Sequence, residues 1–113
     1  GSKTSSNECL LEVIRPKIVC VCCCAGTDEY TDIKENQFPT QAMIDRIAPY
    51  TDAVYVTSQF ADNGDGYTSM NGNIVVTSSA GSNVTVRGSV NDVKLKDTAW
   101  FLENRTMPQA WAA

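Results

Sequence analysis

The sequence predicts an α/β fold, because helix-like and strand-like apolar patterns alternate along its 113 residues. Apolar residues recur at helical spacing within residues 5–15 and again within 39–48. Short apolar runs typical of buried strands follow each of them, at residues 17–24 and 52–57. A chain of this length can bury one hydrophobic core, so we expect residues 1–113 to form a single small domain.

The first helix is expected to begin at Ser5, because Ser5 and Glu8 have the spacing of a capping box. Arg15 should end it, since the residue before a proline avoids the helical conformation. Its core-facing stripe is predicted to be Leu10, Leu11, Val13 and Ile14. The run from Lys17 to Cys24 is apolar at successive positions, which is typical of a strand covered on both faces and usually central in its sheet.

A polar stretch over residues 27–37 predicts a surface loop. Pro39 is placed in the first turn of the second helix, where proline is tolerated. The apolar positions of that helix are Ala42, Met43, Ile44 and Ile47. Residues 59–72 are rich in Gly, Asn and Asp and predict a turn or loop.

Two further strands are predicted at residues 73–78 and 83–87, joined by a short connection into a hairpin. Asp97 is expected to cap a final short helix over residues 98–104. The tail after Pro108 is expected to be frayed, with docking of Trp111 as an alternative.

The cysteine pattern points to reduced thiols and not to a disulfide framework. The count is odd, and neighbours two apart in a strand rarely form a disulfide. The CxxC spacing of Cys20 and Cys23 leaves a soft-metal or redox site as an alternative, but plain packing of buried thiols is favoured, since free cysteine is often buried. The five cysteines are Cys9, Cys20, Cys22, Cys23 and Cys24.

Composition excludes several classes of site within this chain. There is no histidine, so a Ser-His-Asp triad, a Cys-His dyad and a His-built metal site are all impossible here. The net charge of −4 argues against a basic nucleic-acid surface. No apolar run approaches the roughly 20 residues of a membrane helix. The stretch Asp62–Gly66 resembles a calcium loop, but position 73 is Asn where the distal Glu would lie, so a surface turn is favoured.

The order of these motifs resembles the C-terminal part of metallo-β-lactamase-fold hydrolases, in particular those related to DNA-internalisation competence proteins of the ComEC type. In that family a run like His-Gly-Ser-Lys-Thr-Ser leads into a helix and then a Pro-Lys strand, a loop ending in His-Pro opens the next helix, and a strand and a terminal hairpin follow. The resemblance covers about residues 2–87. The matching stretches are Gly1–Ser6, Val13–Lys17, Phe38–Gln41, Val54–Thr57, Asn71–Ser78 and Val84–Val86.

This resemblance implies the C-terminal half of an αββα sandwich: a small mixed sheet, two main helices on one face and a terminal hairpin. It also implies a bacterial parent protein that hydrolyses a phosphodiester or similar bond with two divalent metals, zinc or manganese. The family's His-x-His-x-Asp-His motif would lie upstream, and Gly1 is interpreted as a residue left by protease cleavage. We therefore expect no catalytic residue, metal ligand or cofactor in this chain and no activity from it alone. Phe38 departs from the histidine that the family often has before this proline.

Substrate contact is expected only from Ser2, Lys3 and Thr4, the residues nearest to the family's active site. The expected partner is the missing N-terminal half of the domain. Without it, we expect either two copies to pair through the exposed sheet face or the tail helix around Trp100 and Phe101 to cover that face. The alternative function is a non-catalytic interaction module that uses the hairpin edge and the acidic loops. The residues leave nucleic-acid binding open, as well as the choice between a cytoplasmic and a membrane- or surface-associated location.

Overall fold

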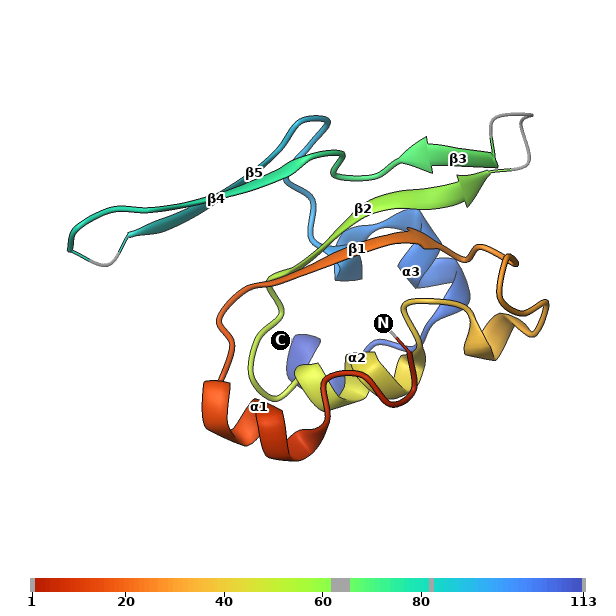
Figure 1. Cartoon of the computed structure of the whole chain (residues 1–113), viewed down its shortest axis with the longest axis horizontal. Coiled ribbons are helices and arrows are strands. Elements are labelled where there is room, and N and C mark those ends of the chain that lie inside the picture. The colour runs from red at the N-terminus through yellow and green to blue at the C-terminus, as the bar shows by residue number, and fades with distance from the viewer. Residues whose placement is uncertain (1, 62–65, 82, 113) are drawn as a thin grey trace.

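A computed structural model of the chain describes residues 2–61, 66–81 and 83–112. Within these residues the fold is mixed α/β, with three α-helices and two small sheets, which confirms the predicted class (Figure 1). The helices are α1 (Glu8–Ile14), α2 (Gln41–Ile47) and α3 (Ala99–Asn104). The strands are β1 (Val19–Ala25), β2 (Val54–Ala61), β3 (Gly66–Ser69), β4 (Ile74–Ser78) and β5 (Val84–Gly88).

The first sheet has the strand order β1-β2-β3 and is mixed, as expected, because β2 pairs parallel with β1 and antiparallel with β3. The prediction that the first strand is central is wrong, since β1 lies at the sheet edge and β2 lies in the middle. The prediction of a loop over residues 59–72 is also wrong. There β2 runs on to Ala61 and pairs with β3, with Phe60 opposite Tyr67.

The start of α1 differs from the predicted capping box. Asn7 is the N-cap, and its Oδ1 accepts a hydrogen bond from the Leu10 N–H at 3.0 Å. Ser5 cannot cap the helix because it belongs to the preceding turn, where its Oγ donates to the Ser2 carbonyl at 3.1 Å. The predicted core stripe is wrong as well. Only Leu11 is buried, whereas Leu10, Val13 and Ile14 are at least half exposed.

The predicted buried face of α2 is confirmed, with Met43, Ile44 and Ile47 all inside the core. Its N-cap is Thr40, whose Oγ1 accepts from the Met43 N–H at 3.3 Å. Pro39 therefore lies just before the cap and not in the first turn. The loop that precedes it is polar, as expected, and contains one short 3-10 turn at Lys34–Asn36.

The C-terminal segment packs into the core. The tail after Pro108 is not frayed over Gln109–Trp111, and the docking of Trp111 that the sequence left open is confirmed. Leu95 and Phe101 are fully buried, and the rings of Phe101 and Trp111 lie 5.7 Å apart. The indole N–H of Trp111 also donates to the Thr51 carbonyl at 2.8 Å. Thr98, and not Asp97, caps α3, because the Thr98 Oγ1 accepts from the Phe101 N–H.

Figure 1 shows α1, α2 and α3 on one side of the three-stranded sheet. The core lies between these two layers, and Trp100 and Phe101 belong to it. The alternative in which the tail helix covers the opposite face of the sheet is therefore wrong. The predicted hairpin is confirmed as the separate two-stranded sheet β4-β5, with Val76 opposite Val86. In the part of the chain that the structure describes, no helix is long and apolar enough to cross a membrane.

Asp52 ties the C-terminal segment to the turn before β2. Its carboxylate accepts from Lys94 Nζ at 2.9 Å and from Lys96 Nζ at 2.8 Å. Hydrogen bonds from Lys96 and Lys94 lower the pKa of Asp52. A carboxylate with a lowered pKa stabilises the fold above its unfolded pKa of about 3.9, and this stabilisation is lost as the pH falls through the folded pKa.

We therefore expect Asp52→Asn to lower the free energy of unfolding at pH 7 by about 1 kcal/mol or less, because this ion pair is partly exposed to solvent. The variant should also lose less stability than the wild type between pH 5 and about pH 3. Urea unfolding at several pH values measures both effects. Asp32→Asn is the control, because Asp32 is exposed and has no ion pair among the described residues. Equal acid sensitivity of the wild type and Asp52→Asn would contradict the assignment.

Candidate functional site

The face of β1 that points away from the helices is the first candidate site. Val19, Val21 and Cys23 pack against the core, whereas Cys20 and Cys22 are exposed. This alternation follows from the strand geometry, which turns successive side chains to opposite faces. The prediction of buried thiols is thus wrong for Cys20 and Cys22, because the helices do not cover this side of β1. The same side of β2 is partly covered, since Tyr55, the register partner of Cys20, is buried. We call this surface, lined by Cys20 and Cys22, the open sheet face.

The thiols are free and not activated. Burial raises the pKa of Cys23 to about 11. Desolvation and, to a smaller extent, the neighbouring Cys22 raise the pKa of Cys20. Because the thiolate is the reactive form, raised pKa values make these poor nucleophiles at neutral pH. Among the described residues, no group of three or more Cys, Asp or Glu side chains is placed to hold a metal ion.

A cleft of about 240 Å³ lies at the carboxyl end of β1. In open α/β sheets, this end of the strands is where ligands commonly bind. The rings of Tyr30 and Phe38 form one side of the cleft, 5.8 Å apart. Glu29 is the only charged side chain in its lining, so the cleft offers aromatic and thiol surface with little charge. The lining residues are Cys22, Cys23, Cys24, Thr27, Glu29, Tyr30 and Phe38.

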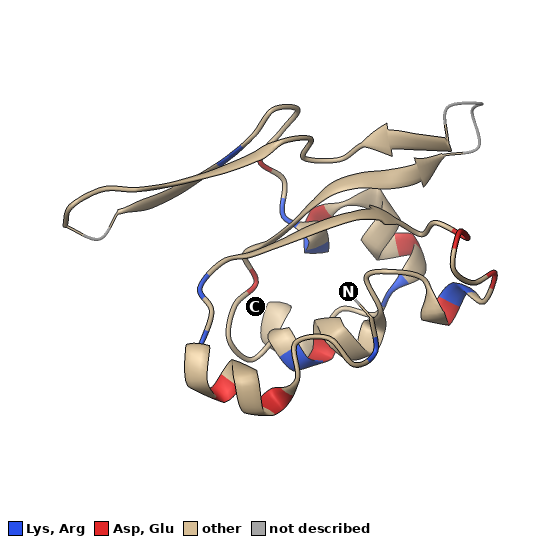
Figure 2. Ribbon diagram, viewed as in Figure 1, with Lys and Arg blue, Asp and Glu red and all other residues tan. Residues whose placement is uncertain are grey.

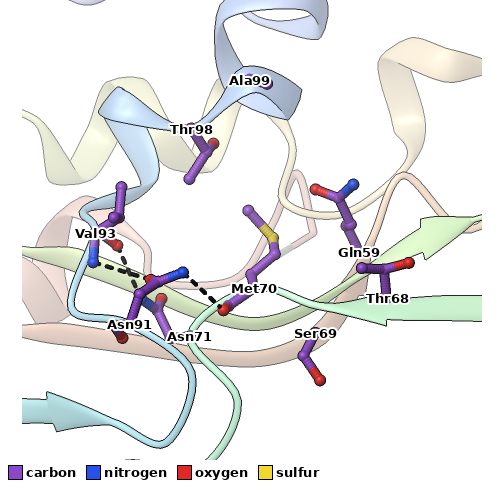
Figure 3. Close-up of a pocket in the computed structure, with 9 residues that line it drawn as sticks. All are labelled: Gln59, Thr68, Ser69, Met70, Asn71, Asn91, Val93, Thr98 and Ala99. Carbon is purple, nitrogen blue, oxygen red and sulfur yellow. Dashed lines mark hydrogen bonds between the residues drawn. The ribbon is translucent and has the colours of Figure 1, made fainter.

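A second cavity of similar volume, about 240 Å³, lies between β3 and the start of α3 and is lined by uncharged residues (Figure 3). Asn71 at its edge is buried and fully bonded. Its Oδ1 accepts from the Val56 N–H at 2.8 Å, and its Nδ2 donates to the Val93 carbonyl at 2.9 Å and to Asn91 Oδ1 at 3.0 Å. Asn71 therefore joins β2 to the segment after the hairpin, which is a structural role.

The N-terminal residues Ser2, Lys3 and Thr4 form a turn beside α2. Ser2 Oγ accepts from the Ser5 N–H at 3.1 Å and lies 3.4 Å from Thr4 Oγ1. The Arg46 guanidinium of α2 holds this turn, donating to the Ser5 carbonyl at 2.6 Å. Within the described residues the exposed Lys3 side chain has no hydrogen-bond or ion-pair partner. The structure thus brings the Ser2 and Thr4 hydroxyls together and leaves the Lys3 ammonium in solvent.

Arg105 organises the loop that lines the cleft, a role that sequence reasoning missed. Its guanidinium donates to the Gln37 carbonyl at 2.7 Å and to the Pro39 carbonyl at 2.9 Å. It also lies 4.8 Å from the centre of the Trp100 ring, a cation–π distance. Burial lowers the pKa of Arg105. One side chain from the C-terminal segment therefore fixes the loop between β1 and α2.

The calcium-like stretch Asp62–Gly66 lies outside the described residues except for Gly66. Comparison with known proteins adds no relative: no protein-family model, curated protein or solved structure matches this chain.

Proposed function

We propose that this chain is the C-terminal segment of a metal-dependent hydrolase of the metallo-β-lactamase superfamily, of the ComEC-like type. Its fold is then the C-terminal half of an αββα sandwich. The N-terminal half of the same domain carries the metal ligands and packs on the open sheet face. On this proposal the segment supplies the second sheet of the sandwich and is inactive alone.

The order of the elements supports the proposal. A Ser-Lys-Thr turn leads into α1, and the parallel strands β1 and β2 are joined through α2. Strand β3, which the resemblance does not include, comes next, and the antiparallel hairpin β4-β5 follows it. Apart from β3, these elements follow the order that the resemblance implies, with all three helices on one side of the sheet (Figure 1).

The single observation that carries the proposal is the mismatch between the composition and the burial of β1. All seven of its residues, Val-Cys-Val-Cys-Cys-Cys-Ala, are apolar or thiol side chains. Such a run is typical of a strand covered on both faces. The helices cover one face, but Cys20 and Cys22 on the other face are exposed. A second sheet packed on this face would give β1 the environment that its composition predicts.

Two divalent metals, zinc or manganese, held by the N-terminal half, would supply a hydroxide nucleophile at neutral pH. The role we assign to this chain is substrate contact by the N-terminal turn. Hydroxyl groups of Ser2 and Thr4 lie side by side, and the exposed Lys3 ammonium can bind a phosphate oxygen as a point charge. Zinc and manganese titrations of the isolated chain should show no tight stoichiometric binding. Stoichiometric binding would contradict this division of the site.

Thiol labelling tests which face is covered. In the isolated chain we expect a maleimide reagent to modify the exposed Cys20 and Cys22 at about pH 8, with the raised pKa of Cys20 slowing its reaction. Cys23 should react at least tenfold more slowly than Cys22, because Cys23 packs against the core and its pKa is raised to about 11. Peptide mass spectrometry over time measures the rate at each cysteine. Exposed Cys9 on α1 is the internal control, since the proposal leaves it uncovered.

The same labelling is then done on a longer chain that includes the upstream residues encoded by the native gene. It distinguishes the half-sandwich proposal from its alternatives. Protection of Cys20 and Cys22 with continued labelling of Cys9 is the expected result. Equal labelling of all three in the extended chain would overturn the half-sandwich proposal. Concentration-dependent protection in the isolated chain, with a doubled mass by light scattering, would instead favour two copies paired through this face.

A second candidate function is a non-catalytic interaction module. The specific observation in its favour is the hairpin, which extends beyond the ends of β1 and β2 (Figure 1) and exposes Val75, Val76 and Val84. An upstream sequence without His-x-His-x-Asp-His would favour this candidate over the hydrolase.

A further inference from the structure

The two outer edges of the hairpin β4-β5 differ in their hydrogen bonding. Backbone bonds Ser89 N–H to Asn73 C=O and Ser79 N–H to Asn83 C=O lie at its two ends, at 2.8 and 3.1 Å. Hydrogen-bonded and non-bonded pairs alternate along an antiparallel ladder. The pairs Val75–Arg87 and Thr77–Thr85 therefore hold the hairpin together. The N–H and C=O groups at positions 74, 76 and 78 of β4, and at 84, 86 and 88 of β5, point outward.

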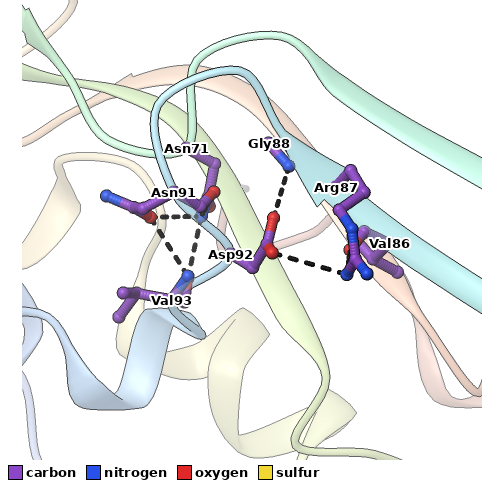
Figure 4. A network of polar contacts seen from close by, with 7 residues as sticks. All are labelled: Asn71, Val86, Arg87, Gly88, Asn91, Asp92 and Val93. Atoms are coloured by element: carbon purple, nitrogen blue, oxygen red, sulfur yellow. Dashed lines mark hydrogen bonds and ion pairs between the residues drawn. The ribbon is translucent and has the colours of Figure 1, made fainter.

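Side chains protect the outer edge of β5 (Figure 4). The outward Gly88 N–H donates to Asp92 Oδ1 at 2.8 Å, and the outward Val86 carbonyl accepts from Arg87 Nη1 at 3.3 Å. Arg87 and Asp92 also form an ion pair at 3.5 Å. Charged side chains at an edge are a common protection against strand addition. One outward backbone group is thus bonded at each of two of the three outward positions of β5, Val86 and Gly88.

The outer edge of β4 has no such protection. Among the described residues, no group bonds the outward backbone of Ile74, Val76 or Ser78. Residues 66–86 contain no Asp, Glu, Lys, Arg or Pro. Figure 2 accordingly shows β4 without a charged residue, and Arg87 lies on β5. An exposed, uncharged strand rich in β-branched residues is a template for pairing with another strand.

We propose that the β4 edge pairs with β4 of a second copy of this chain, antiparallel and with the two-fold axis at Val76. Each Val76 then exchanges both backbone hydrogen bonds with Val76 of the other copy, and each Ile74 does so with Ser78. The product is one four-stranded sheet, β5-β4-β4-β5. This edge is separate from the open sheet face, so the pairing does not rest on the hydrolase proposal.

Self-complementarity is the reason to name a second copy as the occupant: pairing about Val76 sets the outward groups of Ile74, Val76 and Ser78 opposite those of Ser78, Val76 and Ile74. The chain carries a net charge of −4, which opposes association of two copies wherever their acidic surfaces meet. The β4 edge is a neutral strand on which they can meet, and it offers no charge to attract a basic or acidic partner. Pairing about Val76 also places like faces together, so the Ile74 and Val76 side chains of both copies form one continuous apolar strip.

Sedimentation velocity over a range of protein concentrations tests the pairing. A strand pair is smaller than a standard interface, so we expect a dissociation constant on the order of 100 µM and a mass that rises toward twice 12.3 kDa. Val76→Lys and Val76→Glu should each weaken the dimer on the order of tenfold or more, because like charges meet at the two-fold axis. An equimolar mixture of the two variants should restore the dimer, because Lys and Glu then face each other.

Val86→Lys is the matched control, since it adds the same charge to the same face of the hairpin but on β5, and it should leave the dimer unchanged. Amide exchange of the wild type gives a second readout that needs no variant. Exchange at the Val76 N–H should slow with concentration, whereas exchange at the Val86 N–H should not. The proposal is overturned by a monomer at all concentrations, by no restoration in the mixture, or by equal effects of Val76→Lys and Val86→Lys.

Discussion

Replacing Phe101 with alanine should lower the free energy of unfolding by about 3–5 kcal/mol. Phe101 is fully buried and packs on Trp111, with the two ring centres 5.7 Å apart. It also belongs to the same core cluster as Ile44 of α2 and Val56 of β2, so truncation removes apolar contact and leaves a cavity. A domain of this size has a total stability of about 5–15 kcal/mol, so the loss takes a large part of it.

Leu102→Ala is the matched control for this variant. Leu102 is the next residue of the same helix, but its side chain is 62% exposed. The expected change is within about 0.5 kcal/mol. Urea unfolding followed by far-UV circular dichroism measures both variants. Similar losses from Phe101→Ala and Leu102→Ala would show that α3 does not contribute to the core as the structure describes.

Elements with strong local patterns could be predicted from the sequence. The buried face of α2 and the hairpin β4-β5 follow from apolar spacing and from the turn between the strands, which are local properties. Strand β3 could not be predicted, because its Gly-Tyr-Thr-Ser sequence has no apolar alternation and forms only by pairing with β2. The predicted cap of α1 failed because Ser5 belongs to a turn with Ser2, so that its Oγ donates to the Ser2 carbonyl and Asn7 caps the helix instead.

In the candidate site, too, local patterns could be predicted from the sequence and long-range contacts could not. The thiol cluster was visible in the sequence, and so was the alternation that places Cys20 and Cys22 on one face. Which face the helices cover depends on packing and could not be predicted. Arg105 could not be identified from the sequence, because three of its four carbonyl acceptors lie in a loop about 70 residues earlier in the chain. The two edges of the hairpin also look alike in sequence, and only the fold brings Asp92 against Gly88.

The exposed apolar surfaces of the chain are explained in part if the chain belongs to a larger assembly. The open sheet face, the outer side of α1 and the β4 edge all carry residues that usually lie inside a fold. The proposed N-terminal half accounts for the first of these, and pairing of two copies accounts for the third. These contacts use different surfaces of the chain, so both can form in the same protein.

Gly26→Ala should destabilise the fold by about 2–5 kcal/mol, for two reasons that add. Gly26 has a φ of +77°, in the left-handed region that side chains disfavour. A Cβ at this position would also lie 2.6 Å from Trp100 Nε1. Trp100 is buried and stacked under Arg105, so it cannot move without loosening the loop between β1 and α2.

Gly66→Ala separates the two causes. Gly66 has nearly the same φ, +80°, but a Cβ there meets no atom of the described residues within 4 Å. Gly66→Ala should therefore lower the free energy of unfolding only by the cost of the left-handed backbone conformation, about 1–2 kcal/mol. The difference between the two variants in urea unfolding measures the cost of displacing Trp100. Tryptophan fluorescence should shift to the red in Gly26→Ala alone, because the indole moves toward solvent. Equal losses of unfolding free energy and equal fluorescence spectra in the two variants would mean that Trp100 can move aside without cost. The contacts of Trp100 and Arg105 would then not fix the loop between β1 and α2.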